Sequence, residues 1–286
     1  FNCQTYGYQK IWMINCGITG SSGVLGKKIR KNLPYKFYCF KKDITNYYDV
    51  KKWIDNKQLD LIIHLAAIVP TNEVNKNYTK AKKINVIGTK NLVKSIINSK
   101  NKPKWFFFSS TSHVYNISYI NKKINENEII HPISKYGKTK RDAELIIQRN
   151  FKKKGIVFCI GRIFSFTDKK QKNSYVIPSL IKQIKNSKKK EITLKNLNHY
   201  RDFLSTKDIS LAIKKLFDKK AQGIFNIGSG KKFSLQNIAK LIAKKHKKNT
   251  KFISNKRFTY LISNNNKLLK LGWKPKKYKA KLNYFY

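Results

Sequence analysis

The sequence predicts an α/β protein built on a doubly wound parallel sheet, with a smaller C-terminal α/β lobe. Short apolar runs alternate with helical patterns along most of the 286 residues, and this alternation indicates a parallel sheet covered on both faces. A glycine-rich turn joins the first apolar run to the first helix. The hydrophobic fraction of 41% and the aromatic fraction of 13% are enough for a sizeable core.

The stretch 11–26 is the element around which the chain is organised. It reads as strand, turn and helix, with Gly20, Gly23 and Gly26 in the spacing G-x-x-G-x-x-G. Gly20 would permit the tight turn, Gly23 would let the backbone approach a pyrophosphate, and Gly26 would let the helix pack on the strand. The helix N-terminus offers N–H groups to phosphates. The pattern predicts a Rossmann-type dinucleotide site, although other α/β proteins also contain glycine turns.

The remaining elements are expected in the following order. Up to Arg162 we expect a short helix that ends near residue 54, longer helices at 23–32, 79–99 and 134–150, and strands at 35–40, 59–65, 105–109 and 156–160. Beyond Arg162 the pattern loosens. There we expect strands at 191–194, 201–204 and 223–227, and helices at 175–184, 206–219 and 234–245. Ser205 or Thr206 is available to cap the helix at 206–219.

These elements suggest two domains. We expect 13–165 to form the dinucleotide-binding domain, with 201–227 returning to it. The segments 166–200 and 228–286 would form a substrate-binding lobe over the carboxyl edge of the sheet, where open α/β sheets bind ligands. The chain starts at Phe1 without Met, and Met13 stands directly before the first strand. We therefore expect 1–12 to be a non-native or fragment N-terminus.

The chain is strongly basic, with 63 Lys+Arg against 14 Asp+Glu and a formal net charge of +49. Only six of these basic residues are arginines. Proteins that recognise phosphates and base edges favour Arg for its bidentate fork, whereas these lysines are spread along the whole chain. The composition indicates a general drift towards AT-rich codons rather than a basic surface patch that was selected for binding. We expect no specific nucleic-acid partner, only loose binding to polyanions at low salt.

The four cysteines are Cys3, Cys16, Cys39 and Cys159, and they show no metal-ligand spacing. Three of them fall in expected strands, which predicts small buried thiols in a reducing compartment. We therefore expect a cytoplasmic protein without a metal site. No apolar run is long enough to cross a membrane, so no membrane association is expected.

The sharpest chemical pattern is Tyr136-x-x-x-Lys140 on an expected helix. Positions i and i+4 share a helix face. A lysine ammonium beside a tyrosine would lower the pKa of the phenol, so that Tyr136 exchanges a proton with a sugar hydroxyl or carbonyl. A chain rich in lysine also produces this spacing by chance. The hydroxyl-rich segment 109–115 directly follows the strand at 105–109, which would place hydroxyls at the sheet edge.

The order of several motifs resembles one family. These are the glycine turn, Asp43-Ile44-Thr45, His64-Leu65-Ala66-Ala67, Asn85 before Gly88-Thr89, the segment SSTSHVY, Tyr136-x-x-x-Lys140, Arg162, Arg201-Asp202-Phe203 and Asn226-Ile227-Gly228-Ser229-Gly230. Their order is similar to that of the extended short-chain dehydrogenase/reductases, the NAD-dependent epimerase/dehydratase family that acts on nucleotide sugars. The likeness covers 13–275. The short spacing from Gly26 to Asp43 is similar to that of dTDP-4-dehydrorhamnose-reductase-like members.

The resemblance implies roles for individual residues. Thr111, Tyr136 and Lys140 would be catalytic, with Tyr136 as general acid/base. The implied cofactor-binding residues are Gly20, Ser22, Gly23, Val24, Gly26, Lys41, Asp43, Ile44, Leu65, Ala66, Ala67, Asn85, Ser109, Tyr136 and Lys140. The implied substrate-binding residues are Thr111, Ser112, His113, Ser165, Val176 and Arg201, with Arg201 on the diphosphate of the nucleotide sugar. The family also implies a homodimer formed through the helices around Asn85 and Lys140.

Three departures from the family pattern refine this expectation. Dehydratases of the family carry Asp-Glu where this chain has Ser112 and His113, so 4,6-dehydration is disfavoured. Ser165 stands where Asn is usual. No acid closes the strand at 35–40, and such an acid would bind the ribose 2′-OH of NAD. Lys41 and Lys42 would instead meet a 2′-phosphate, so the cofactor is NAD or NADP with a lean to NADP.

Two hypotheses of different classes remain. The first is an NAD(P)-dependent nucleotide-sugar epimerase or ketosugar reductase. The second is a non-catalytic dinucleotide-binding regulator or RNA-associated scaffold on the same fold. The presence of Thr111, Tyr136 and Lys140 together argues against the second, because a scaffold has no need of all three. We also expect His64 to be a packed core histidine, since it lies in a strand.

Overall fold

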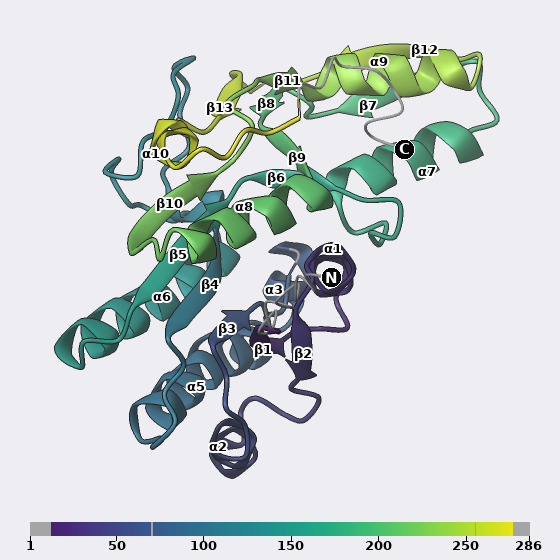
Figure 1. The fold of residues 1–286 in the computed structure, drawn as a ribbon. Coiled ribbons are helices and arrows are strands. Elements are labelled where there is room, and N and C mark those ends of the chain that lie inside the picture. The colour runs from purple at the N-terminus through teal and green to yellow at the C-terminus, as the bar shows by residue number, and fades with distance from the viewer. Residues whose placement is uncertain (1–12, 70, 255, 277–286) are drawn as a thin grey trace, which may run out of the picture.

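The computed structural model describes residues 13–69, 71–254 and 256–276, so the expectation for 1–12 and Cys3 lie outside the described residues. Its centre is a six-stranded sheet in the order β10-β5-β4-β3-β1-β2 (Figure 1). Every neighbouring pair is parallel. The strands are β1 (Asn15–Thr19), β2 (Lys36–Cys39), β3 (Leu61–His64), β4 (Trp105–Thr111), β5 (Phe158–Ile163) and β10 (Gly223–Ile227). The predicted doubly wound fold is confirmed.

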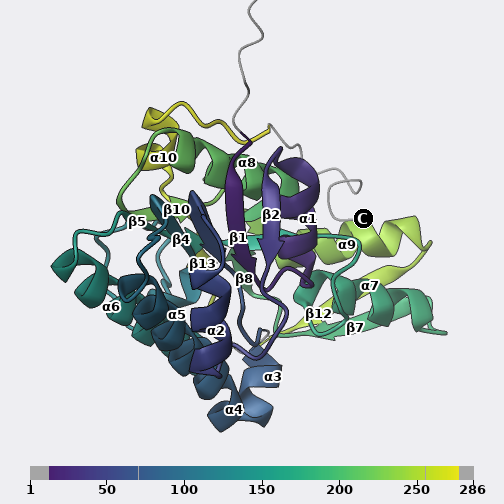
Figure 2. The same ribbon diagram turned by 60° about the horizontal axis from the view of Figure 1, so that its bottom comes forward.

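Helices cover both faces of this sheet. On one face lie α1 (Val24–Asn32) and α8 (Thr206–Asp218), which contact each other. The other face carries α2 (Tyr47–Asp55), α5 (Gly88–Ile97) and α6 (Lys135–Lys153), as Figure 2 shows. The central strand β4 serves both cores because its side chains alternate: Trp105 and Phe107 join one core, and Phe106 and Phe108 the other.

Helix starts follow local sequence signals. Ser134 caps α6 by accepting from the Gly137 N–H, and Ser205 caps α8 by accepting from the Asp208 N–H. Such caps satisfy N–H groups that have no partner within the helix. The cap of α6 matters for the site, because this helix carries Tyr136 and Lys140 in its first two turns.

The expected long helix at 79–99 is divided. It consists of α4 (Tyr78–Lys82), a π-helical turn η1 (Lys83–Ile87) and α5, and the short helix α3 (Thr71–Lys76) precedes it without having been expected. The expected strand at 201–204 is also divided, into β8 (His199–Arg201) and β9 (Phe203–Ser205). Between them the Asp202 carboxylate accepts hydrogen bonds from Ser229 N, Gly230 N and Ser263 N. These bonds draw the chain out of a continuous strand.

The smaller lobe lies beyond the carboxyl edge of the large sheet (Figures 1 and 2). Its core forms between α7 (Val176–Asn186) and α9 (Leu235–Lys245). Its strands are β6 (Ser165–Thr167), β7 (Glu191–Lys195), β8, β9, β11 (Phe233–Ser234), β12 (Asn249–Ile253) and β13 (Thr259–Leu261), and α10 (Asn266–Lys270) follows them. Since β8 and β9 pair only with these strands, the chain returns to the large sheet at α8 rather than at Arg201.

The described cysteines have no partners of their own kind. Cys16, Cys39 and Cys159 are free thiols in strands, two of them buried and Cys39 half-buried. Burial raises the pKa of the Cys16 and Cys159 thiols above the ordinary range, which suppresses the reactive thiolate. Among the described helices, none combines the length and the apolar character needed to span a bilayer.

Candidate active site

The glycine turn after β1 is shaped for close approach. Gly20 has φ +70°, and a Cβ there would lie 2.7 Å from the Ala66 backbone nitrogen, so both conformation and space require glycine. A Cβ at Gly26 would overlap the Gly20 carbonyl. Gly23 is the N-cap of α1 and provides no side-chain cap, and the first turn of α1 contains no acid. The N–H groups at this helix start are therefore available to phosphate oxygens, which fits a dinucleotide.

A hydrogen-bonded chain supports the loop after β3. The Ala66 N–H donates to Thr19 Oγ1 (3.2 Å), which lies 2.6 Å from His64 Nδ1. His64 Nε2 lies 2.9 Å from Thr89 Oγ1, which donates to the Asn85 carbonyl. This order assigns the Nε2–H tautomer. His64 is fully buried, and burial lowers its pKa to about 3. It is the core histidine that its strand position predicted.

Asn85 lies behind the site. Its Oδ1 accepts from the Ile68 N–H at 2.7 Å, and its Nδ2 donates to Ile68 O and to Thr139 Oγ1. With 1% of its surface exposed, the side chain joins the loop after β3 to α6. Leu65, Ala66 and Ala67 are half-buried at the sheet edge.

The segment after β2 contains two differently placed lysines. Lys42 Nζ pairs with Asp49 Oδ1 at 2.8 Å, whereas Lys41 is exposed and has no ion pair within the described part of the chain. Asp43 accepts a bond from the Thr45 N–H, which lowers the pKa of its carboxyl. The Ile44 side chain is 5% exposed and belongs to the core, and its carbonyl accepts a hydrogen bond from Asn91 Nδ2. Ser22 is exposed at the turn, and Val24 begins α1.

Two of the predicted catalytic residues, Thr111 and Tyr136, meet where β4 ends beside α6. The Tyr136 hydroxyl hydrogen-bonds the side chain of Thr111, the last residue of β4. The expectation of a lowered pKa for Tyr136 is wrong for this state: burial raises it above the ordinary value, nearby Tyr175 adds to the effect, and the Thr111 bond opposes it. The reason is desolvation, which penalises the phenolate. Tyr136 is therefore a phenol at neutral pH.

Lys140 lies one turn further along α6 and is 3% exposed. Its Nζ is 4.2 Å from the centroid of the Phe108 ring, a cation–π geometry. Burial lowers the pKa of Lys140 to about 7, while the Glu144 carboxylate favours the charged form. Lys140 thus changes charge near neutral pH. Ser109 follows Phe108 in β4 and is half-buried.

A pocket of about 190 Å³ opens beside these residues. It brings together the predicted Ser112, His113 and Arg201, and it is also lined by Thr71, Tyr115, Ile117, Ile133, Ser134, Tyr260 and Leu261. The His113 ring meets the Tyr136 ring edge-on at 5.9 Å between centroids. His113 contacts solvent inside the pocket, and the surrounding protein and Arg201 lower its pKa to about 4. It is therefore neutral at pH 7.

Arg201 is held by backbone and side-chain oxygens. Its Nη1 donates to Tyr200 O at 2.9 Å and to Thr259 Oγ1 at 3.1 Å. Burial lowers the pKa of Arg201 to about 10, which leaves it charged at neutral pH. It therefore offers a partly desolvated cation to an anion in the pocket.

A second hollow has a volume of about 430 Å³, and the strands β8 and β13 contribute residues to it and to the first. It is lined by Tyr119, His199, Lys256, Arg257 and Thr259. The sequence analysis named none of these residues. Lys256 and Arg257 are two cations among dozens, and only the fold sets them beside Arg201. Three residues that the sequence suggested for substrate binding do not line either hollow: Thr111 at the end of β4, Ser165 in β6, and Val176, which is 40% exposed at the start of α7.

Comparison with known proteins places the chain among nucleotide-sugar enzymes. The family model described as GDP-mannose 4,6 dehydratase matches residues 19–281. The chain is 28% identical over 269 residues to the GDP-6-deoxy-D-talose 4-dehydrogenase of Aggregatibacter actinomycetemcomitans, covering 88% of this chain and 89% of that protein. It is 30% identical over 227 residues to the dTDP-D-glucose 4,6-dehydratase of Dictyostelium discoideum, covering 75% of this chain. The match spans 51% of that relative.

The same architecture occurs in solved structures. RMD from Pseudomonas aeruginosa, complexed with NADPH, superposes with a TM-score of 0.85 at 22% sequence identity. The superposition covers 96% of this chain and 97% of that one. At this identity the likeness concerns the fold, including the two-lobed arrangement around the sheet edge.

Proposed function

Because this chain belongs to the GDP-mannose 4,6-dehydratase family of extended short-chain dehydrogenase/reductases, we propose that it is an NAD(P)-dependent nucleotide-sugar oxidoreductase that reduces a keto group on the sugar. The observation that carries this proposal is the meeting of Thr111 and Tyr136 beside the pocket that contains Arg201. The proposed proton donor Tyr136 contacts His113, and His113 lines the same pocket as the proposed anion site Arg201. A nucleotide-sugar epimerase remains the second candidate, since it uses the same acid/base.

The protonation states favour the reductive direction. NAD(P)H, when bound, supplies the hydride. Tyr136 is a phenol at neutral pH because burial raises its pKa, so it donates a proton to the carbonyl oxygen as that oxygen gains charge. Thr111 orients the phenol through its hydrogen bond. Charged Lys140 then stabilises the tyrosinate that remains.

The two hollows suggest how a nucleotide sugar lies. The sugar would occupy the smaller pocket next to Tyr136, and its diphosphate would meet Arg201. The nucleoside would extend into the larger hollow, where Lys256 and Arg257 add positive charge. Arginine provides bidentate donors for phosphate oxygens, and β8 and β13 hold both parts of this path in one sheet.

Two features bear on the reaction and the cofactor. Ser112 and His113 line the pocket and carry no carboxylate, and on this ground we propose that 4,6-dehydration is disfavoured. Exposed Lys41 is available to a 2′-phosphate, whereas Lys42 is engaged with Asp49. We therefore propose NADP(H) as the preferred cofactor. We also propose a homodimer through the helices around Asn85 and Lys140, which light scattering on the purified protein tests.

The deciding experiment begins with purification at high salt, denaturation and mass spectrometry of any released dinucleotide. A protein free of dinucleotide that binds NADPH better than NADH, and oxidises NADPH when given 4-keto-6-deoxy nucleotide sugars, supports the reductase. Tightly held NAD with interconversion of UDP-sugars supports the epimerase instead. Cofactor binding without turnover, together with salt-resistant RNA binding, would favour the regulator or scaffold and overturn the proposal.

A further inference from the structure

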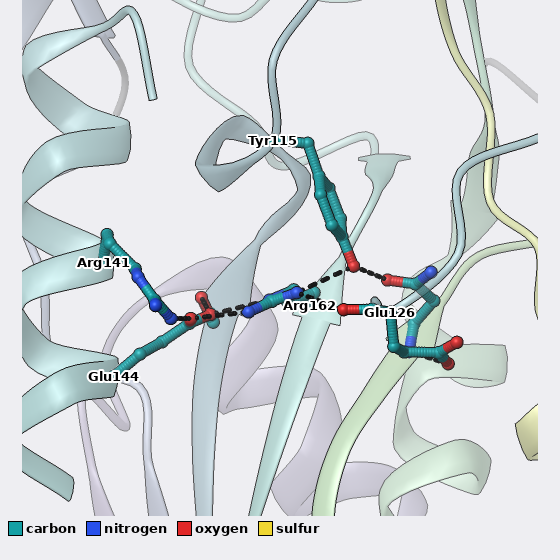
Figure 3. Close-up of polar contacts among 7 residues, drawn as sticks. Tyr115, Glu126, Arg141, Glu144 and Arg162 are labelled. Carbon is teal, nitrogen blue, oxygen red and sulfur yellow. Dashed lines mark hydrogen bonds and ion pairs between the residues drawn. The ribbon is translucent and has the colours of Figure 1, made fainter. Parts of the chain in front are cut away.

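A buried ion pair lies one turn beyond Lys140. The Glu144 carboxylate accepts from Arg162 Nε at 3.0 Å and from Arg162 Nη2 at 2.9 Å, so the pair is bidentate (Figure 3). Its oxygens also accept from Ser110 Oγ at 2.5 Å and from Arg141 Nη1 at 3.0 Å. Glu144 is 0% exposed and Arg162 1% exposed. Burying two ions this deeply costs desolvation free energy. A pair retained at this cost suggests a role in holding neighbouring elements in place.

The pair also reaches into the loop after β4 and into the last strand of the sheet. Arg162 Nη1 donates to the Tyr115 hydroxyl at 3.0 Å and to the Glu126 carbonyl at 3.1 Å. The Tyr115 hydroxyl donates to Asn226 Oδ1 at 2.7 Å. Asn226 in turn donates to the Ile124 carbonyl. One network therefore ties α6, β4, β5, β10 and the loop 115–126 together, as Figure 3 shows for its central residues.

This network adjoins every proposed catalytic group. Tyr136, Lys140 and Glu144 recur at every fourth position, so they form one stripe on α6. Ser110 directly precedes Thr111 at the end of β4. The Glu144 bonds to Ser110 and Arg162 thus fasten the stripe to the ends of two adjacent strands. A bidentate pair in which Nε, Nη1 and Nη2 of the arginine each donate at least one hydrogen bond permits little sliding.

We propose that Glu144 is a positioning residue of this active site, which acts with Arg162 to hold α6 against the ends of β4 and β5 and to keep Lys140 charged. The inference rests on the proposed roles of Tyr136 and Lys140. It goes beyond them because Glu144 touches neither substrate nor cofactor and acts through Lys140 and Thr111.

The charges around Lys140 support this role. Glu144 faces it from the same helix, and His64 of β3 lies close enough to influence it. His64 is uncharged at neutral pH, since burial lowers its pKa to about 3. Arg162 and Arg141 are paired with Glu144 itself. Burial disfavours the ammonium, and Glu144 is the group that opposes burial.

The test compares Glu144→Gln with Asp142→Asn, which removes the same charge two residues away on α6 without touching the network. For Glu144→Gln we expect kcat to fall on the order of 10- to 100-fold, with KM for NADPH unchanged, because displaced reacting groups mainly slow the chemical step. Without the Glu144 carboxylate the pKa of Lys140 should fall, so Lys140 should lose its charge at a lower pH than in the wild-type protein. The alkaline limb of the kcat profile should therefore move down by about one pH unit. Asp142→Asn should show neither change.

A milder variant guards against loss of folding. Tyr115→Phe removes only the hydroxyl that joins Arg162 to Asn226. We expect it to lower kcat without moving the alkaline limb, since Glu144 keeps its charge. Near-UV circular dichroism establishes that each variant is folded. A folded Glu144→Gln enzyme with unchanged kcat and an unchanged alkaline limb would overturn the inference.

Hydrogen exchange separates this inference from the proposed function. If Glu144 holds α6, Glu144→Gln increases amide exchange in peptides that cover 111–115 and 135–153, and Asp142→Asn does not. A wild-type protein that turns over no keto-sugar nucleotide would refute the proposed function, and exchange would still report on the positioning role. Unchanged exchange in the Glu144→Gln protein would refute that role whatever the activity.

Discussion

The Tyr136 hydroxyl hydrogen-bonds the Thr111 side chain, although the two residues come from different elements of the fold. Thr111 ends a central strand, and Tyr136 lies in the first turn of α6. Their contact joins the end of β4 to the start of α6. The Tyr136 ring also contacts the ring of His113, which lines the pocket that contains Arg201.

Replacing Tyr136 with Phe removes the proposed proton donor and little else. We expect turnover to fall roughly 10²- to 10⁴-fold, the range of general acid/base effects, while folding and NADPH binding persist. Tyr48→Phe is the matched control, because Tyr48 is 82% exposed on α2. Steady-state kinetics with NADPH absorbance measures both variants, and full activity in Tyr136→Phe would refute the assigned role.

The pH profile should report Lys140. Its pKa of about 7 means that the charged form is lost as pH rises through neutrality, so kcat/KM, which reports on the free enzyme, should decline above about pH 7. Lys140→Arg keeps its charge across this range, so any activity that it retains should extend to higher pH. A decline at the same pH in both proteins would assign the limb to another group.

Cofactor preference should depend on one of two neighbouring lysines. Lys41→Ala should weaken NADPH binding by roughly tenfold, the order of one lost charge contact to phosphate, and should leave NADH binding unchanged. Lys42→Ala should have a smaller effect, since Lys42 is paired with Asp49. Fluorescence titration with both dinucleotides measures this, and an equal loss for NADH and NADPH would exclude a 2′-phosphate contact.

Arg201→Lys should raise the KM for the nucleotide sugar by roughly tenfold or more, because a lysine cannot replace a bidentate arginine at phosphate. The affinity for NADPH should not change. Arg149→Lys, an exposed substitution on α6, is the control. If KM for the sugar stays constant in Arg201→Lys, the diphosphate lies elsewhere.

Folding stability should fall in acid partly through His64. Its pKa is about 3 in the folded state against the ordinary 6.5, so the unfolded chain binds a proton first as pH falls. The stabilisation that comes from keeping His64 uncharged is complete above about pH 6.5. As the pH falls to about 3, the free energy of unfolding decreases by on the order of 5 kcal/mol.

Urea unfolding at several pH values measures this slope. His64→Gln retains a donor and an acceptor for Thr89 and Thr19 but cannot titrate, so its stability should depend less on pH between 3 and 6.5. His131→Gln is the control, because His131 is exposed. An equal slope in the wild-type and His64→Gln proteins would place the acid sensitivity elsewhere.

Local signals predicted most of the nucleotide-binding half. The continuous apolar run at 105–108 indicated a buried strand, and Gly20 indicated a turn that the structure forms with positive φ. The smaller lobe was harder to predict, because strands such as β11 and β13 are two or three residues long. Strands this short carry no readable period, and their pairing partners lie far away in sequence.

The site divides in the same way. Thr111, Tyr136 and Lys140 stand in spacings that resemble a family, so sequence alone could nominate them. Glu144 and Arg257 could not be nominated, since one acid on a helix and one more cation carry no signal of their own. Their importance arises from the side chains that face them, which come from distant segments.

The sequence by itself determined the glycine turn and the order of most elements, because each depends on neighbours within a few positions, and it nominated Thr111, Tyr136 and Lys140 for the proposed proton transfer. Only the tertiary structure decided the direction in which the pKa of Tyr136 shifts, the pairing of Glu144 with Arg162 and the placing of residues from β8 and β13 in both hollows. Desolvation and ion pairing depend on atoms gathered from the whole chain. A local pattern therefore cannot specify them.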